Sequence, residues 1–393
     1  MLLGLVVGFL AERDASWLGE IGKLVIQLIK VMATPLLFLA VVNAVLHNDV
    51  SGRSGARMVV IALVNASIAL AVGLMVSNIF EPGHHLDLHG DEARGRAPDK
   101  LVPIDFGKTL TSYIPTSLVQ PFLDNAIIPL VLFALFFGFA LRRVRREGAH
   151  PRGVQITSDL LAAMLRVAEV SLTWIITLIP LAVFAVVAKS VGEYGLRPIV
   201  GLGAYVLAGV GGLALHAAVT YHLWLVLYVR MPLRRFWRAA KDPVVYAMGA
   251  NSSLATLPVT LQALDRLGVS KGSSTLGACV GTNLNNDGII LYEAMAVLFV
   301  AQAHGIHLDA GQQLLAIVSC MVAAMGIAGV PEAGFISLSI VLATVGLPVE
   351  LLPILLTVDW IIARGRSVVN VLSDMLVSII LDRWSGRRFD ASP

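Results

Sequence analysis

The sequence predicts an all-α membrane protein that crosses the bilayer several times. Hydrophobic residues make up 57% of the 393 positions and charged residues only 14%, whereas a soluble domain carries about 25% charged residues. Basic and acidic joints alternate between apolar runs, and small polar residues interrupt some of those runs. A spanning helix needs roughly 20 apolar residues. Runs of that length, with few or no charges, cover residues 24–46, 59–80, 199–229 and 314–345.

The joints between the apolar runs alternate in charge. Arginine and lysine dominate the joints at residues 53–57, 142–152, 230–241 and 383–388. The intervening joints are neutral or acidic, at residues 12–20, 81–105, 193 and 304–309. Because cytoplasmic loops carry an excess of Lys and Arg, we expect the basic joints and both chain ends to be cytoplasmic. Each basic cluster could instead bind a lipid head group or a nucleic acid, an interpretation that the regular alternation disfavours.

Other features bound the class of protein. Cys279 and Cys320 lie in apolar segments outside any CxxC pair, so we expect no disulfide framework and no thiolate metal site. The polar segment 82–108 is typical of an extracellular loop. The first apolar stretch, residues 2–10, would cover only about 15 Å as a helix, so we expect an earlier start or an incomplete first helix. The short loops favour a bacterial inner membrane.

Small and polar clusters interrupt the apolar runs from about residue 249 onward. The clusters are residues 249–253, 281–288 and 326–334. Non-helical backbone at membrane depth survives only where it lines a protein cavity, and interrupted segments in corresponding positions of two halves mark transporter sites. A tip with Pro258 precedes a helix broken at Asn285 and Asp287, and a tip with Pro331 precedes the last apolar helix. The repeat predicts two related halves that enclose one site.

Five positions of the predicted last helix, residues 351–381, lie on one helical face. They are Asp359, Ala363, Arg366, Asn370 and Asp374, spaced by four, three, four and four residues. Ionisable groups at this depth face the protein interior and mark pathways or binding sites. Arg366 offers a rigid fork of donors suited to a carboxylate, which predicts an anionic substrate. The alternative is that these charges only pair with one another, although buried ion pairs contribute little to stability.

Asp287 and Asp374 are candidate cation ligands, because each lies beside amide side chains and backbone that we expect to be unwound. Hard cations take carboxylate, amide and backbone oxygens as ligands. Asp287 could instead cap the helix at the break, and H⁺ could replace Na⁺ on a buried carboxylate. Ser252 and Ser253 occupy the first tip, where hydroxyls and free N–H groups can meet an anion. A pair of serines also occurs as a helix-packing device.

Four ordered motifs stand out in the C-terminal half. They are Asn-Ser-Ser-Leu-Ala-Thr-Leu-Pro-Val-Thr at 251–260, Asn-Asn-Asp-Gly at 285–288, Gly-Val-Pro-Glu-Ala-Gly at 329–334 and Arg-Ser-Val-Val-Asn-Val-Leu-Ser-Asp at 366–374. With Ala-Ala-Lys-Asp at 239–242 and Ile-Ile-Pro at 127–129, they resemble the dicarboxylate/amino acid:cation symporter family, which includes the glutamate transporters. The likeness covers nearly the whole chain.

The resemblance implies the glutamate-transporter-homologue fold, with eight transmembrane helices plus two re-entrant hairpins related as inverted repeats. It also implies a homotrimer and an elevator motion of a transport part against a trimerisation scaffold, within a single integral membrane unit. The scaffold part would be mainly 1–57 and 109–196, and the transport part mainly 58–81 and 197–382. Residues 82–108 would form the extracellular loop.

The resemblance also assigns ligand positions. Arg366 would hold one substrate carboxylate and Asn370 the other, and the second hairpin would be the extracellular gate. The substrate-binding residues would be Ser252, Ser253, Val330, Gly334, Arg366 and Asn370. The residues around the coupling Na⁺, with H⁺ as the other candidate, would be Asn65, Gly281, Asn285, Asp287, Asn370 and Asp374.

Departures from the family pattern bear on substrate and cation. Members that carry amino acids place an Asp, which holds the substrate ammonium, where this chain has Ala363, and a Thr where it has Ile289. With Ala363 in place of that Asp, a buried substrate ammonium would have no charge partner, and breaking such a pair costs about 3–5 kcal/mol. A C4-dicarboxylate, which has no ammonium, is therefore favoured over glutamate or aspartate. The third-helix Tyr and Thr-Ser of the deeper sodium site appear as Ala62, Asn65 and Ala66, which predicts an altered or absent site.

The predicted function is therefore secondary active symport of a small dicarboxylate, with no enzymatic activity and no nucleic-acid partner. The alternative within the same class is an acidic amino acid:cation symporter. A substrate sensor and an anion channel on the same fold are the hypotheses from other functional classes. An intramembrane enzyme with Asp287 and Asp374 as paired carboxylates lacks any accompanying phosphate loop, metal triad or Ser/His pair. Some family members carry an Arg where Asn251 stands, a role that Arg364 could take, and Glu332 at the second tip has no explanation.

Overall fold

The part of the chain that this computed structural model describes is helical. The described residues are 2–11, 17–47, 53–86, 114, 117–124, 127–148, 150–194, 197–326, 333–349, 351–387 and 389. Among them, three helices are long and apolar enough to cross a membrane, at Arg53–Phe80, Pro151–Lys189 and Gly201–Val229. The prediction of an all-α protein with several membrane-length helices is confirmed at this level.

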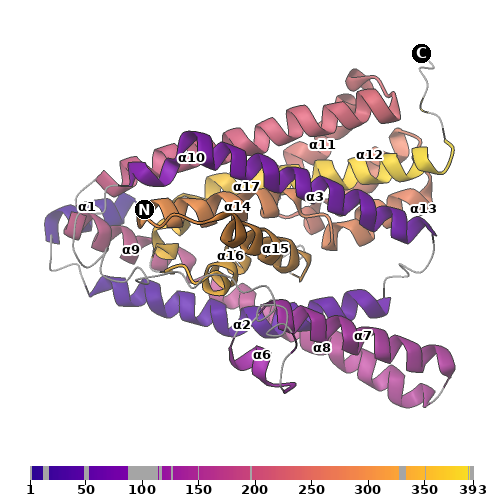
Figure 1. Cartoon of the computed structure of the whole chain (residues 1–393), viewed down its shortest axis with the longest axis horizontal. Coiled ribbons are helices and arrows are strands. Elements are labelled where there is room, and N and C mark those ends of the chain that lie inside the picture. Colours follow the sequence, from indigo (N-terminus) through magenta and orange to yellow (C-terminus); the bar gives the residue numbers. More distant parts are fainter. Residues whose placement is uncertain are drawn as a thin grey trace.

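One group of helices packs around α2 along the lower side of the view in Figure 1. α2 contacts α7, α8 and α9, and α9 contacts α1. Glycines let α1 and α9 approach closely, because a Cβ on Gly8 of α1 would lie 2.5 Å from the carbonyl oxygen of Ala188 in α9. The group comprises α1 (Leu2–Ala11), α2 (Leu18–His47), the short α6 (Gln120–Leu123), α7 (Ile127–Glu147), α8 (Pro151–Ile176) and α9 (Ile179–Tyr194).

A second group surrounds α17 (Leu352–Trp384), which extends the predicted last helix by one turn. Every residue of α17 from 369 to 382 is buried, and the helix contacts α10, α11, α12 and α14. α3 lies along α14. The bounds are α3 (Arg53–Phe80), α10 (Arg197–His216) with its π-helical continuations η3 (Ala217–Tyr221) and η4 (Trp224–Val229), and α14 (Asp287–Ala303).

Two helix pairs carry the interrupted segments. α11 and α12 pack together and meet at Asn251, whose φ of 49° is left-handed and turns the chain between them. α15 and α16 form the second pair. The residues between α15 and α16, with Val330 and Glu332, lie outside the described residues. The bounds are α11 (Leu233–Ala250), α12 (Ser253–Arg266), α15 (Ala310–Gly326) and α16 (Ala333–Thr344).

The chain between α12 and α14 is broken at the position that the sequence predicts. Three short elements, α13 (Lys271–Ser274), η5 (Thr275–Val280) and η6 (Gly281–Asn283), follow one another. Residues 284–286 are non-helical, and α14 then starts at Asp287. The π-helical η5 crosses α17 closely, because a Cβ on Gly277 would lie 2.5 Å from the backbone nitrogen of Ser378.

The start of the predicted extracellular loop is packed against helices. η2 (Pro82–His85) contacts α10 and α14. The Gly83 N–H donates to Gln302 Oε1 at 3.0 Å, and a Cβ on Gly201 would lie 2.5 Å from the carbonyl oxygen of His85. Pro82, Gly83 and Leu86 are buried in this packing, whereas His84 and His85 are exposed. The extracellular position of the loop stays a prediction. Residues 87–108 lie outside the described part of the chain.

Candidate functional site

Arg366 is buried in α17 and contacts three elements. Its Nη2 donates to Asp359 Oδ2 at 2.8 Å, and both side chains are almost completely buried. Its guanidinium carbon lies 4.0 Å from the centre of the Tyr292 ring on α14, a cation–π contact. A Cβ on Gly334 would lie 2.6 Å from Arg366 Nη1, so α16 begins against the guanidinium. The ion pair that the sequence left as an alternative exists for Asp359.

Glu293, the residue after Tyr292 in α14, adds a second carboxylate to this region. Its side chain is fully buried, and Oε1 accepts a hydrogen bond from Ser337 Oγ on α16. Oε2 has no hydrogen-bond partner among the described residues. Ser337 Oγ also lies 3.2 Å from the carbonyl oxygen of Gly334, the residue that lies against the Arg366 guanidinium. A carboxylate on α14 therefore connects the guanidinium region to the second helix pair.

Asn370, one turn beyond Arg366, joins α17 to the broken segment. Its Oδ1 accepts from the backbone N–H of Gly288 at 2.8 Å, and its Nδ2 donates to Asn286 Oδ1 at 3.4 Å. Asn286 in turn donates to the carbonyl oxygen of Ala324 in α15 at 2.8 Å. Gly288 cannot carry a side chain here, because a Cβ would lie 2.5 Å from the carbonyl oxygen of Arg366. This amide chain orders the region between α14, α15 and α17.

Asp374 faces the same break one turn further along α17. Oδ2 accepts from Thr282 Oγ1 at 2.7 Å, and Oδ1 accepts from Asn285 Nδ2 at 3.3 Å. A Cβ on Gly281 would lie 3.6 Å from Oδ1. Three residues predicted to surround a cation, Gly281, Asn285 and Asp374, therefore lie together. Thr282 joins them, and its hydroxyl is an additional oxygen at this point.

Asp287 is fully buried at the start of α14 and collects donors from two other helices. Oδ2 accepts from Ser373 Oγ at 2.5 Å and from Tyr221 Oη at 3.0 Å. His216 Nε2 lies 3.5 Å from the same oxygen, and its side chain is also fully buried. Asp287 Oδ1 has no hydrogen-bond partner among the described residues. Ser373 Oγ also lies 3.0 Å from Asn285 Oδ1, so its single hydroxyl proton has two alternative acceptors, one in each carboxylate cluster.

The first helix pair reaches this region through its tip. Ser252 caps α12, because its Oγ accepts from the N–H of Ala255 at 3.1 Å. Ser253 is buried at the first turn of α12. Ser367 Oγ on α17 donates to Asn251 Oδ1 at 3.1 Å. The tip is therefore anchored beside Arg366, and Ser252 has a capping role in addition to the predicted ligand role.

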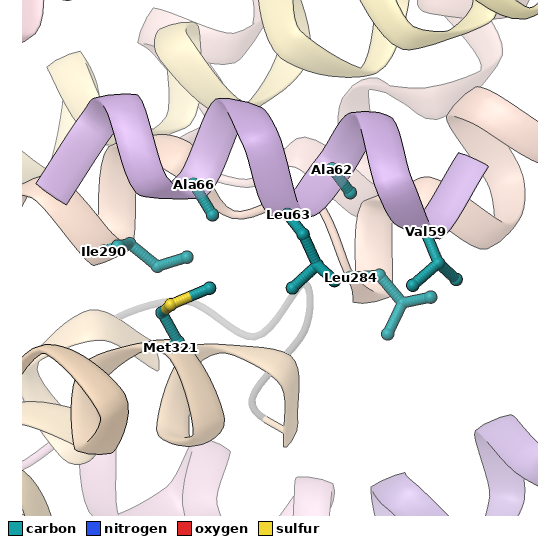
Figure 2. Close-up of a pocket in the computed structure, with 7 residues that line it drawn as sticks. All are labelled: Val59, Ala62, Leu63, Ala66, Leu284, Ile290 and Met321. Atoms are coloured by element: carbon teal, nitrogen blue, oxygen red, sulfur yellow. The ribbon is translucent and has the colours of Figure 1, made fainter. Parts of the chain in front are cut away.

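One face of α3 beside the break is apolar (Figure 2). Its side chains line a pocket together with residues of the broken segment, α14 and α15. The lining residues are Val59, Ala62, Leu63 and Ala66 of α3, with Leu284, Ile290 and Met321. The small Ala62 and Ala66 point into this space and bring no oxygen atom to it. Asn65 is fully buried, and neither atom of its amide has a hydrogen-bond partner among the described residues. Of these three α3 positions, Asn65 alone has a side-chain oxygen for a cation.

The oxygen atoms of this region suit a hard cation. Carboxylates, amide carbonyls and hydroxyls are the ligands that Na⁺ and other hard cations take. Asp287 Oδ1 and Asn65 Oδ1 are both buried without a hydrogen-bond partner in the described residues. Unpaired buried acceptors are costly, and a bound cation would satisfy them. The chemistry of the predicted cation-binding residues therefore fits a cation.

Sequence reasoning missed several polar groups that the structure adds to the site. They are His216, Tyr221, Thr282, Tyr292, Glu293 and Ser337. Two of them could have been found, because His216 and Glu293 are ionisable groups within apolar runs, the same signal that identified Arg366. The tyrosines and hydroxyls gave no such signal, since these residue types are common in apolar helices.

Ionisable groups buried this deeply in a membrane protein are typical of transport pathways. The chain belongs to a transporter family rather than to an enzyme family. The family model described as "Sodium:dicarboxylate symporter family" matches residues 1–384, so the chain is a member of that family.

Bacterial relatives in this family carry two kinds of name. A "Proton/sodium-glutamate symport protein" of Geobacillus stearothermophilus is 26% identical over 98% of this chain and 93% of its own length. A "C4-dicarboxylate transport protein" of Deinococcus radiodurans is 29% identical over 98% of this chain and 87% of its own. A "C4-dicarboxylate transport protein 3" of Ralstonia nicotianae is 31% identical over 98% and 86%, respectively. The chain thus aligns over nearly its whole length with both kinds of transport protein.

Proposed function

We propose that this protein is a secondary active symporter that imports a small dicarboxylate, with a C4-dicarboxylate as the favoured substrate. The observation that carries the proposal is the buried guanidinium of Arg366 against Gly334 at the start of α16. One turn before it, Ala363 is buried with an apolar side chain. The site thus has a cation for a substrate carboxylate and, at position 363, no anion for a substrate ammonium.

Arg366 can serve its internal partner and a substrate together. A guanidinium presents five N–H donors in a fixed fork, and Asp359 accepts from Nη2. Asn370 would provide an amide for the second carboxylate of the substrate, and Ser252 and Ser253 would add contacts from the first tip. Val330, which the family resemblance assigns to the second tip, lies outside the described residues. A C4-dicarboxylate has two carboxylates and no amine, which matches this set of groups.

Na⁺, or H⁺ in its place, would couple to the substrate through the two buried carboxylates. Gly281, Asn285, Asn370 and Asp374 would surround one cation, and Asp287 with Asn285 and Asn65 another. A bound cation supplies positive charge that offsets these carboxylates and so favours binding of an anionic substrate nearby. The altered positions Ala62 and Ala66 weaken the deeper of the two sites.

The family architecture supports an elevator mechanism for this transport. The helices around α2 would form the scaffold of a homotrimer, mainly residues 1–57 and 109–196. The helices around α17, mainly residues 58–81 and 197–382, would carry the site across a bacterial inner membrane. In this assignment the chain has eight spanning helices, α11–α12 and α15–α16 are re-entrant hairpins, and the second hairpin is the extracellular gate.

Uptake into proteoliposomes tests the proposal. The purified chain is supplied with labelled succinate or labelled aspartate, with and without an inward Na⁺ gradient, and separately with an inward H⁺ gradient. The expected result is accumulation of succinate against its own gradient, driven by one of the two cations. Aspartate transport without competition from succinate, fumarate or malate would contradict the substrate class. Downhill movement alone would favour an anion channel.

The second candidate is symport of glutamate or aspartate, which the name of the Geobacillus relative favours. In that case the substrate ammonium would need a buried anion close to Arg366. Among the described residues, Asp359 pairs with Arg366, and Glu293 follows Tyr292, whose ring the guanidinium contacts. If aspartate is the substrate, Glu293→Gln should weaken aspartate binding and leave inhibition by succinate unchanged, as measured by competition in the same uptake assay.

A further inference from the structure

The surface at the end of the α10 span has a concentration of cations. The candidate span Gly201–Val229 ends immediately before Arg230, and α11 then carries three more basic residues on its exposed side. The four exposed cations are Arg230, Arg234, Arg238 and Lys241. None of the four forms an ion pair with an acidic side chain among the described residues. Asp242, the acidic residue of α11, pairs instead with Arg266 at 2.9 Å. The patch therefore has uncompensated positive charge where a spanning segment leaves the hydrocarbon.

The packing of α11 determines which side chains face outward. Phe236, Ala240 and Ala247 are buried on its inner side. Arg235 also points inward, where its Nη2 donates to the carbonyl oxygen of Leu267 at 3.1 Å. Arg235 is thus a structural residue, and its neighbours Arg234 and Arg238 remain on the exposed side one turn apart. The outward direction of these cations follows from the helix packing.

An aromatic ring lies among the cations in a defined orientation. The indole N–H of Trp237 donates to His222 Nε2 at 3.0 Å, and the two rings are 5.7 Å apart. Trp237 is nevertheless 38% exposed. Tryptophan with a polar tip and an apolar body is enriched at the level of lipid head groups. The hydrogen bond between α11 and the end of α10 holds the ring beside the cations.

Apolar side chains continue the surface away from the cations. On the α10 side Leu223 is 51% exposed and Leu227 is 68% exposed; on the α11 side Val245 is 72% exposed and Met248 is 51% exposed. A soluble phosphate or a nucleic acid backbone has no apolar part that could contact these side chains. A phospholipid has both parts, an anionic head group and acyl chains.

We propose that Arg230, Arg234, Arg238 and Lys241, with Trp237, form a binding surface for the head group of an anionic phospholipid. The phosphate interacts with the guanidinium and ammonium groups, the indole lies at the head-group level, and the acyl chains lie along the exposed apolar side chains. α11 ends at Ala250, immediately before Asn251 and Ser252, so the lipid binds the same helix that leads to the first tip of the site.

Direct lipid binding tests this surface independently of transport. The binding result can therefore be interpreted even if the protein fails to transport a dicarboxylate. The purified protein in a neutral detergent is titrated with phosphatidylglycerol or phosphatidylcholine, and bound lipid is counted by native mass spectrometry. The triple variant R230Q/R234Q/R238Q is compared with R145Q/R146Q/R152Q, which removes the same charge from exposed positions of α7 and α8.

The wild-type protein should bind phosphatidylglycerol and not phosphatidylcholine. Each basic residue near an anionic lipid contributes about fivefold in affinity, so the α11 triple variant should bind about 100-fold more weakly. The α7–α8 variant should stay within about twofold of wild type. Equal loss in both variants, or retained binding in the α11 variant, would overturn the proposal.

Two further variants keep the test valid if the glutamine triple variant fails to fold. R230K/R234K/R238K preserves the charge and should retain phosphatidylglycerol binding. Trp237→Leu also preserves every charge and should weaken binding severalfold, because it removes the oriented ring. Full binding by Trp237→Leu together with lost binding by the lysine variant would contradict a surface built on charge and an aromatic ring.

Discussion

At the scale of single residues, Arg366 and Asp359 form a buried ion pair within the site. Both side chains are almost completely buried, which costs each charge its hydration. Their ion pair of 2.8 Å offsets that loss. Removing one partner of a buried pair leaves the other charge unpaired, which costs about 3–5 kcal/mol. The substrate role of Arg366 and its structural role can therefore be separated by changing both residues.

We expect Arg366→Ala to abolish anion uptake and to lower the stability of the purified protein by about 3–5 kcal/mol, because Asp359 is left unpaired. The double variant D359N/R366A should recover most of that stability and still fail to transport. The measurements are the thermal unfolding midpoint in detergent and succinate uptake in proteoliposomes. Recovery of uptake in the double variant would show that Arg366 only balances Asp359.

Asp374 permits a matching test of the cation site. Asn in its place keeps an oxygen that can accept from Thr282 Oγ1, a hydrogen bond of 2.7 Å in the structure, but removes the charge. We expect Asp374→Asn to fold and to lose at least tenfold in affinity for the coupling cation, measured as the cation concentration that gives half-maximal uptake.

Asp242→Asn is the control for this test, since Asp242 forms an exposed pair with Arg266. Exposed pairs contribute about 0–1 kcal/mol, so this variant should keep the wild-type cation dependence. An unchanged cation dependence in Asp374→Asn would exclude Asp374 as a ligand.

At the scale of elements, glycines set how closely helices approach Arg366. Gly288 at the start of α14 lies against the backbone of α17, whereas Gly334 at the start of α16 lies against the guanidinium itself. Backbone cannot move without shifting a helix, but the end of a long side chain can change rotamer. The two glycines should therefore respond differently to the same added methyl group.

We expect Gly288→Ala to destabilise the fold by about 1–3 kcal/mol or more, the typical cost of overpacking, because its Cβ would lie 2.5 Å from the carbonyl oxygen of Arg366. Gly334→Ala should cost less stability but raise the substrate concentration for half-maximal uptake, because it displaces the guanidinium. Gly211→Ala in α10 is the control, since a Cβ there meets nothing within 4 Å. Similar stability loss at 288 and 211 would contradict the packing argument.

At the scale of the whole molecule, the helices around α2 present apolar side chains outward. On α8, Ile156 is 67% exposed, Leu160 57% and Val167 65%. In a membrane such a face meets either lipid or another protein, and the family architecture favours a second and third copy of the chain. The helices around α17, in contrast, bury charged groups among themselves.

We expect the purified protein to be a trimer of the 41.8 kDa chain. The measurement is native mass spectrometry or light scattering in detergent, with the contribution of bound detergent subtracted. Replacing Ile156 and Val167 together with Gln should shift the population toward single chains if α8 contributes to the interface. A wild-type protein that is monomeric at all detergent concentrations would contradict the scaffold assignment.

The sequence by itself determined the class of the fold and the principal charges of the site. Apolar runs of about 20 residues predict helices, because every backbone group in lipid must be satisfied internally and a barrel strand needs only about half that length. The spacing of Asp359, Arg366, Asn370 and Asp374 needs only the period of one helix, and α17 has them all on its buried side. The break before Asp287 followed from small polar residues in an apolar run.

The tertiary structure alone decided which groups meet across helices. His216 and Tyr221 are 71 and 66 positions before Asp287 in the sequence, and only the packing of α10 against α14 and α17 brings them to its carboxylate. The same holds for Glu293 with Ser337, and for the η2 segment that contacts α10 and α14. Helical periodicity is a local property and can be read from spacing, whereas contacts between distant segments depend on how side-chain volumes fit together.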